Sequence, residues 1–126
     1  MEFEKAKDIQ KALTHIVSKL DLKYVDASKI VCFRSTGSKS RARARIWSFP
    51  RIWQMALDIK PHYIIEVVSG NFDHLPSDDQ KRVLIHELLH IPKNFSGALL
   101  PHKNRSGRID RRSVEKLFKL YKNNLR

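Results

Sequence analysis

The sequence predicts an α+β fold: a three-stranded, mostly antiparallel sheet packed by an N-terminal helix, a second helix near residues 77–90 and a C-terminal helix. Three observations support this class. Apolar residues recur with a helical period at both ends of the chain, whereas the middle contains short β-branched runs and one segment that alternates with period 2. The length of 126 residues suits one hydrophobic core. We therefore predict a single domain over residues 1–126.

The first half of the chain predicts a helix followed by two strands. In residues 3–20, apolar side chains are spaced as on one face of an amphipathic helix. Residues 30–33 form a short apolar run that ends at turn-forming residues, and residues 42–49 alternate between two faces. We expect these two strands to form a hairpin across a loop near residues 36–40.

A second group of elements begins at Pro50, which stops the second strand and suits the first turn of a short helix over residues 51–57. Residues 63–68, Tyr-Ile-Ile-Glu-Val-Val, predict a third strand. Ser77 and Gln80 have the spacing of a capping box, which predicts the start of a largely buried helix.

The last third of the chain predicts a helix end, a loop and a final helix. Pro92 disfavours helical geometry at the preceding residue, so the buried helix should end at about His90. Residues 92–108 contain two prolines and two glycines and predict an ordered loop. Asp110 is the expected N-cap of the last helix, which carries apolar residues on one face.

Charge and cysteine content exclude several classes of protein. Lys and Arg number 25 against 13 Asp and Glu, a formal net charge of +12, which favours polyanions or acidic proteins as partners. The single cysteine, Cys32, excludes an intrachain disulfide and predicts a buried strand thiol. The N-terminus is too charged for a secretory signal, and no apolar run approaches the roughly 20 residues that span a bilayer. These features predict a cytoplasmic protein with no membrane partner.

The most informative residues are the five that read His86-Glu87-Leu-Leu-His90. Positions i and i+4 of a helix lie on one face, so both imidazoles can bind one ion. Nitrogen ligands on a rigid helix suit Zn²⁺. Glu87 follows the first ligand, and from there its carboxylate can reach a water on the zinc, take its proton and deliver the proton to a leaving amine.

A third protein ligand is needed for a catalytic zinc site. His102 is the first candidate, because it is the only downstream histidine and lies in a loop that can turn back toward the helix. Glu115 on the last helix is an alternative, and Asp110 is another, although it is better explained as a helix cap. His62 and His74 are the upstream candidates.

Two enzyme classes that share this motif do not fit. Metzincins place a third histidine six residues after the second and have a downstream methionine turn, but Ser96 holds that position and no methionine follows Met55. Bacterial peptide deformylases use an upstream cysteine ligand in a Gly-Cys-Leu context, whereas Cys32 stands in Ile-Val-Cys-Phe-Arg.

A longer stretch resembles a known family. Residues 86–102, with the sequence His-Glu-Leu-Leu-His-Ile-Pro-Lys-Asn-Phe-Ser-Gly-Ala-Leu-Leu-Pro-His, are similar to the signature of the phage and archaeal metallopeptidase family, small zincins related to the SprT-like peptidases. The stretches at 44–46, 50–57 and 63–67 also resemble that family, so the resemblance covers roughly residues 40–103.

The resemblance implies a zinc-dependent metallopeptidase with a small zincin-like fold and a protein or peptide substrate. Carried over to the matching positions, it implies His86, His90 and His102 as zinc ligands and Glu87 as the catalytic residue. Zincins generally bind substrate as an extra strand along a sheet edge, and the strand at residues 63–68 directly precedes the metal helix. By this analogy we expect that strand to receive the substrate.

Basic residues suggest a second partner. Arg41, Arg43 and Arg45 are expected to share one strand face with Trp47, a combination that suits phosphate contacts and base stacking. We therefore hypothesise that this surface binds nucleic acid or nucleoprotein.

Two alternative functions are compatible with the sequence. One is a metal-dependent ribonuclease, and the other is a non-catalytic nucleic-acid-binding protein whose fold is stabilised by zinc. Glu87 discriminates between them and a peptidase, because only the peptidase requires this carboxylate for turnover. A peptidase also needs an oxyanion stabiliser, for which Tyr63, Arg105 and Arg108 are the available candidates.

Overall fold

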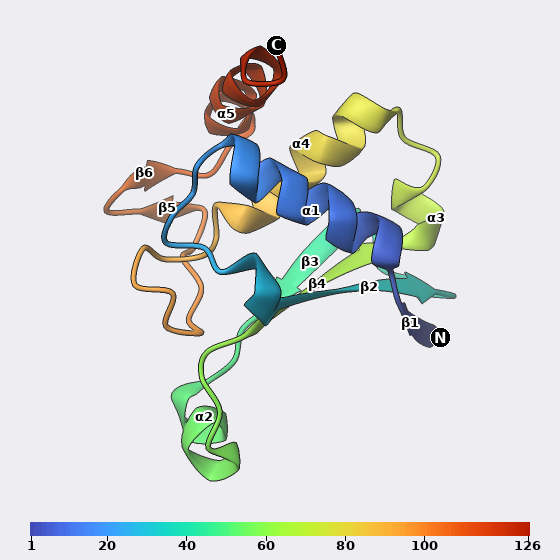
Figure 1. The fold of residues 1–126 in the computed structure, drawn as a ribbon. Coiled ribbons are helices and arrows are strands. Elements are labelled where there is room, and N and C mark those ends of the chain that lie inside the picture. The colour runs from blue at the N-terminus through green and yellow to red at the C-terminus, as the bar shows by residue number, and fades with distance from the viewer.

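The computed structural model describes all 126 residues and contains a mixed four-stranded sheet with most helices gathered on one of its faces (Figure 1). The strands are β1 (Glu2–Lys5), β2 (Ile30–Thr36), β3 (Ala44–Trp47), β4 (Tyr63–Val68), β5 (Lys103–Asn104) and β6 (Gly107–Arg108). The helices are α1 (Lys7–Lys19), the 3₁₀ turn η1 (Ala27–Lys29), α2 (Arg51–Leu57), α3 (Ser69–Phe72), α4 (Ser77–Leu88) and α5 (Arg111–Asn123). The predicted α+β class is confirmed.

The main sheet has the strand order β1-β2-β4-β3. β2 and β4 run parallel, whereas β1 pairs antiparallel with β2 and β3 pairs antiparallel with β4. The predicted three-stranded sheet and the predicted hairpin of the first two strands are therefore wrong, because β4 lies between β2 and β3. Five of the six residues of β4 are buried. A strand that is largely apolar on both faces is most stable in the interior of a sheet.

The N-terminal residues form a strand instead of the first turn of a helix. Glu2–Lys5 pairs through its backbone with the end of β2, and the N–H of Ala6 donates to the carbonyl of Cys32 at 2.9 Å. Phe3, which the sequence assigned to the helical stripe, is 51% exposed. The helix α1 consequently begins at Lys7, and its first buried apolar residue is Ile9.

The helix-covered face of the sheet carries the hydrophobic core, a cluster of 21 buried residues. Cys32, Ile65 and Val67 lie on this face and pack against α1 and α4. Cys32 is 1% exposed, and burial raises the pKa of its thiol to about 12. The prediction of a buried strand thiol is confirmed.

The two predicted helix caps have different outcomes. Asp110 caps α5 as predicted, since its carboxylate accepts from the N–H of Ser113 at 2.9 Å and the Ser113 hydroxyl accepts from the N–H of Asp110 at 2.9 Å. The capping box at α4 is wrong. Ser77 is already the first helical residue, and the amide of Gln80 donates instead to carbonyl oxygens at the end of α3. These acceptors lie seven and eight positions before Gln80, so the spacing of a capping box does not reveal them.

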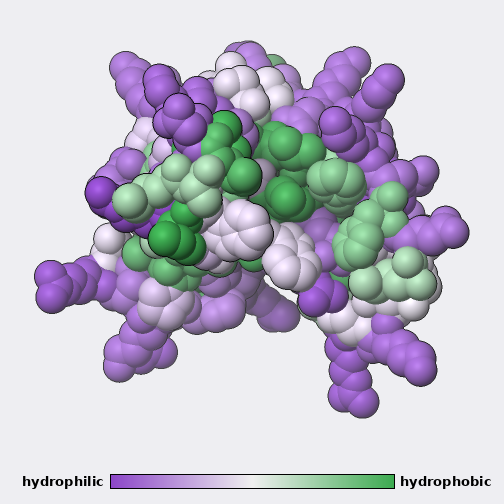
Figure 2. All heavy atoms as spheres, turned by 90° about the horizontal axis from the view of Figure 1, so that it is seen from below, coloured by the Kyte–Doolittle hydropathy of each residue, from purple (hydrophilic) through white to green (hydrophobic).

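The opposite face of the sheet has no layer of helices, and α2 extends beyond one end of the strands (Figure 1). Seen from this side, hydrophobic residues gather across the middle of the surface and hydrophilic residues surround them (Figure 2). Strand register places Trp47 and Ile64 on this face, and both are exposed. No residue of α2 is buried.

Candidate metal centre and active-site cleft

The two histidines of the motif lie at the end of α4, where the last turn tightens. His86 is in the helix, and His90 follows in a turn closed by the hydrogen bond from its N–H to the carbonyl of Glu87 at 3.1 Å. The two rings face each other edge to face, with centroids 5.2 Å apart. His90 is buried and His86 is half-buried. The helix thus places both imidazoles on one side, as the i, i+4 spacing predicted.

A pair of hydrogen bonds fastens the following loop to His90. The backbone carbonyl of His90 accepts from the N–H of Leu100 at 2.7 Å, and its Nδ1 lies 2.6 Å from the carbonyl oxygen of Leu100. Since a carbonyl only accepts, Nδ1 carries the proton and Nε2 keeps its lone pair. A carbonyl that accepts from the other ring nitrogen fixes both the tautomer and the ring orientation of a metal-binding histidine.

The same loop brings His102 to the two histidines on the helix. His102 Nε2 lies 3.3 Å from His86 Nε2, and ligand atoms of all three histidines lie within 4.8 Å of one another. Tetrahedral Zn²⁺ with nitrogens at 2.0–2.1 Å separates two ligand atoms by roughly 3.3 Å. The donor type and the spacing therefore fit a zinc ion, and the cluster is compatible with metal binding.

The alternative third ligands are engaged elsewhere. Glu115 accepts a hydrogen bond from Arg82 Nε at 2.9 Å, and Asp110 caps α5. His62 lies with its Nδ1 2.7 Å from the carbonyl oxygen of Lys60, and neither His62 nor His74 belongs to the three-histidine cluster. Of the candidates in the sequence, the structure brings only His102 to the other two histidines.

Glu87 is a buried acid with no hydrogen-bond partner in the protein. The residue as a whole is 7% exposed, no protein donor reaches its carboxylate, and the carboxylate oxygens are not completely enclosed. Burial raises the pKa of Glu87 to about 7. Burial, together with the neighbouring His90 and His102, lowers the pKa of His86 and favours the neutral imidazole that a metal requires. A carboxyl group whose pKa lies near neutral pH can both accept and donate a proton.

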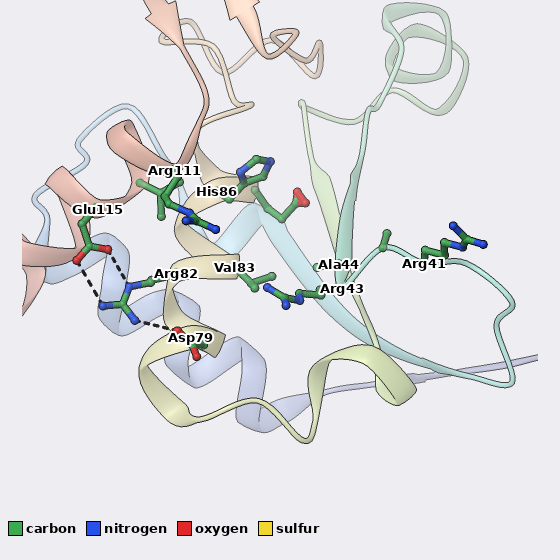
Figure 3. Close-up of a pocket in the computed structure, with 12 residues that line it drawn as sticks. Arg41, Arg43, Ala44, Asp79, Arg82, Val83, His86, Arg111 and Glu115 are labelled. Atoms are coloured by element: carbon green, nitrogen blue, oxygen red, sulfur yellow. Dashed lines mark hydrogen bonds and ion pairs between the residues drawn. The ribbon is translucent and has the colours of Figure 1, made fainter.

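An open cleft of about 730 Å³ reaches His86 and Glu87. One wall is the segment that leads into β3, and the other walls are α4 and the first turns of α5 (Figure 3). On the α4 side, Arg82 forms ion pairs with Asp79 at 2.8 Å and Glu115 at 2.9 Å. The helices α4 and α5 are thereby joined beside the metal centre.

A comparison that covers nearly the whole chain identifies the family to which it belongs. A family model described as "Putative phage metallopeptidase" matches residues 1–122. The chain belongs to this phage metallopeptidase family. The match extends well beyond residues 40–103, on which the sequence resemblance rested, and includes α1 and most of α5. No curated protein and no solved structure matches the chain. None of its helices combines the length and the apolar character needed to cross a bilayer.

The arginines predicted to share one strand face are divided between two places in the structure. Arg41 and Arg43 line the cleft, because Arg43 lies in a bend before β3 begins. Arg45 lies within β3 on the open face of the sheet, with Nε 3.3 Å from Glu66 Oε1 and its guanidinium 5.9 Å from the Trp47 ring centre. A continuous basic stripe is therefore absent from this strand.

Sequence reasoning missed the contacts that hold the loop beside the metal centre. Tyr63, a candidate oxyanion stabiliser, donates its hydroxyl to the carbonyl of Ala98 at 2.8 Å and accepts from the N–H of Gly97 at 2.9 Å. Gly97 has φ +93°, and a Cβ at this position would collide with the carbonyl oxygen of Phe49. Tyr63 therefore positions the loop that leads to His102. In the sequence, Gly97 was a weak indication of a constrained loop. Nothing in the sequence indicated that the Leu100 backbone contacts His90.

Proposed function

We propose that this chain is a zinc-dependent metallopeptidase of the zincin type, in which His86, His90 and His102 hold the metal and Glu87 is the catalytic base. The observation that carries the proposal is the position of Glu87. Glu87 is a buried residue whose carboxylate has no protein partner, and it lines the same open cleft as His86, one of the three clustered histidines. Burial of an unpaired acid is unfavourable for folding, and such groups concentrate where chemistry requires them.

The proposed reaction is hydrolysis of a peptide bond. Zinc at the three histidines would supply a Lewis acid and lower the pKa of a coordinated water to about 7. Glu87 accepts a proton as the water oxygen attacks the carbonyl carbon, and the same carboxyl donates that proton to the amine nitrogen as the C–N bond breaks. The Leu100 carbonyl holds His90 in the tautomer that leaves Nε2 free.

The edge strand β3 is the better place for an extended substrate than β4. The expectation that residues 63–68 receive the substrate is wrong, since β4 is paired on both sides. β3 is paired on one side only. The carbonyl of Arg43 accepts from Val68, so by alternation Ala44 and Ile46 direct their N–H and C=O groups to the free edge. Ala44 lines the cleft with His86 and Glu87, which puts this edge next to the reacting groups.

The test is a comparison of wild type with Glu87→Gln. Both proteins are loaded with zinc and assayed on unfolded proteins and on DNA-bound basic proteins. We expect the variant to keep its fold and its zinc and to lose activity by about 10²- to 10⁴-fold, because an amide cannot accept the proton. Glu4→Gln, on the exposed strand β1, is the matched control and should behave as wild type.

The outcomes separate the three candidate functions. Equal peptidase activity of wild type and Glu87→Gln would refute the role of Glu87. Cleavage of RNA that survives the substitution, without peptidase activity, would favour the metal-dependent ribonuclease. Tight zinc binding without cleavage of any substrate would favour the non-catalytic nucleic-acid-binding protein, in which the metal only stabilises the fold.

A further inference from the structure

The cleft beside the metal centre contains more positive charge than its own acids neutralise. Four arginines line it, Arg41, Arg43, Arg82 and Arg111, against three acids, Asp79, Glu87 and Glu115. Asp79 and Glu115 both pair with Arg82, whose guanidinium also lies 4.1 Å from the Phe118 ring centre. Arg82 therefore has a structural role. No carboxylate lies within ion-pair distance of the other three arginines.

Two of these free arginines face the cleft from opposite walls. In Figure 3, Arg111 extends from the start of α5 toward His86, and Arg43 extends toward α4 from the segment before β3. Arg41 points away from the cleft in the same view. Arg43 and Arg111 are thus the pair placed to meet a ligand bound near His86.

The backbone at both positions is anchored. Arg111 is the first residue of α5, directly after the capping box of Asp110. The carbonyl of Arg43 accepts from the N–H of Val68 at 2.9 Å, and the amide of Asn71 donates to the carbonyls of Ser40 and Ala42 at 2.8 Å. An anchored backbone limits the conformational entropy lost when a ligand orders the side chains.

The position of Arg111 is unfavourable for the helix that carries it. The N-terminus of a helix has a partial positive charge, which favours acids and disfavours cations in the first turn. The first turn of α5 has no acidic residue and begins with Arg111 and Arg112. The proximity of Arg43, Arg82 and Arg111 adds repulsion between like charges. Local conflicts of this kind are expected at functional sites.

We propose that the substrates of this peptidase carry acidic side chains next to the scissile bond, and that Arg43 and Arg111 bind them. A guanidinium binds a carboxylate through two parallel hydrogen bonds, which fixes its position as well as its charge. The inference rests on the proposed peptidase function and specifies its substrate class. Nucleic acid is the competing ligand, since phosphate also pairs with arginine.

The test measures binding separately from cleavage. Fluorescent peptides that differ only in Glu, Gln or Lys on either side of the central bond are titrated onto zinc-loaded Glu87→Gln protein. We expect the Glu peptide to bind about 10- to 100-fold more tightly than the Gln peptide, the range typical of hydrogen bonds to charged groups. The preference should weaken at high salt.

Substitutions locate the preference. In the Glu87→Gln background, Arg43→Gln and Arg111→Gln together should reduce the ratio of Glu to Gln affinity to about one. Arg112→Gln is the matched control, because Arg112 is adjacent but does not line the cleft. It should leave the ratio unchanged. Zinc content and thermal unfolding of each variant show whether the fold is retained.

Three results would overturn the proposal: equal binding of the Glu and Gln peptides, a preference that survives the double substitution, or displacement of the Glu peptide by a short single-stranded DNA or RNA that binds more tightly and depends on the same arginines. Failure of wild type to cleave any peptide would instead contradict the peptidase function. That failure leaves the binding comparison unaffected, so the two errors can be distinguished.

Discussion

Two buried glutamates in this protein have opposite surroundings. Glu66 in β4 is 1% exposed and accepts from the Ser35 hydroxyl at 2.6 Å and from the indole N–H of Trp47 at 3.0 Å, with Arg45 Nε 3.3 Å away. Glu87 in α4 is 7% exposed and has no hydrogen-bond partner. Both residues are buried acids, but only Glu66 has hydrogen-bond donors that compensate for the burial of its carboxylate.

The difference separates a structural acid from a reactive one. The partners of Glu66 come from β2 and β3, so its carboxylate connects three strands on the open face of the sheet. Glu87 lines the cleft together with His86, and burial raises the pKa of Glu87 to about 7. Burial alone therefore does not identify a functional acid. A buried acid that lacks partners and borders an open cleft is the informative case.

The largest expected difference between the two regions concerns metal affinity. His102→Ala should lower zinc affinity by more than about 100-fold. Loss of a group that only hydrogen-bonds to a metal ligand already lowers affinity by about 10- to 100-fold, and loss of the ligand itself should cost more. Glu66→Ala should leave zinc affinity unchanged. Competition with a fluorescent zinc chelator measures both. Unchanged affinity of His102→Ala would transfer the ligand role to another residue.

The next effect concerns the free energy of unfolding of the metal-free protein. Glu66→Ala leaves the Trp47 N–H and the Ser35 hydroxyl without their acceptor and Arg45 without its ion-pair partner, and it should destabilise the fold by about 2–4 kcal/mol. Glu87→Ala removes no hydrogen bond and should change stability by less than about 1 kcal/mol. Urea unfolding followed by circular dichroism tests the pair. Equal destabilisation by the two substitutions would show that Glu66 and Glu87 contribute equally to the stability of the fold.

A surface carboxylate provides the smallest effect and the pH test. Arg34 donates to Asp8 at 2.9 Å, and this hydrogen bond lowers the pKa of Asp8. A folded-state pKa below the unfolded value stabilises the fold at higher pH, and this contribution disappears as pH falls through the folded-state value. Because Asp8 is largely exposed, Asp8→Asn should cost less than about 1 kcal/mol at pH 7.

The same measurement between pH 7 and pH 2 checks the sign. The difference in unfolding free energy between wild type and Asp8→Asn should shrink once the pH falls below about 4, the unfolded-state value for Asp. A difference that stays constant or grows toward acid pH would show that the Arg34 pair does not stabilise the folded state.

The sequence by itself determined the features that depend on one segment. The period of apolar residues located α1, α4 and α5, and the i, i+4 spacing placed His86 and His90 on one face of a helix. Asp110 as an N-cap is also local, because a cap bonds only to the next turn. In each case the interacting residues are within four positions of one another.

Tertiary structure alone decided what depends on distant residues. β4 lies between β2 and β3 because parallel pairing of residues 30–35 with 63–68 replaces the hairpin that sequence order suggested. His102 joins the site because Leu100 pairs with His90, while Glu115 is held by Arg82. These contacts join residues separated by 10 to 33 positions. Backbone groups such as the Leu100 carbonyl are common to every residue type, so no residue pattern can reveal them.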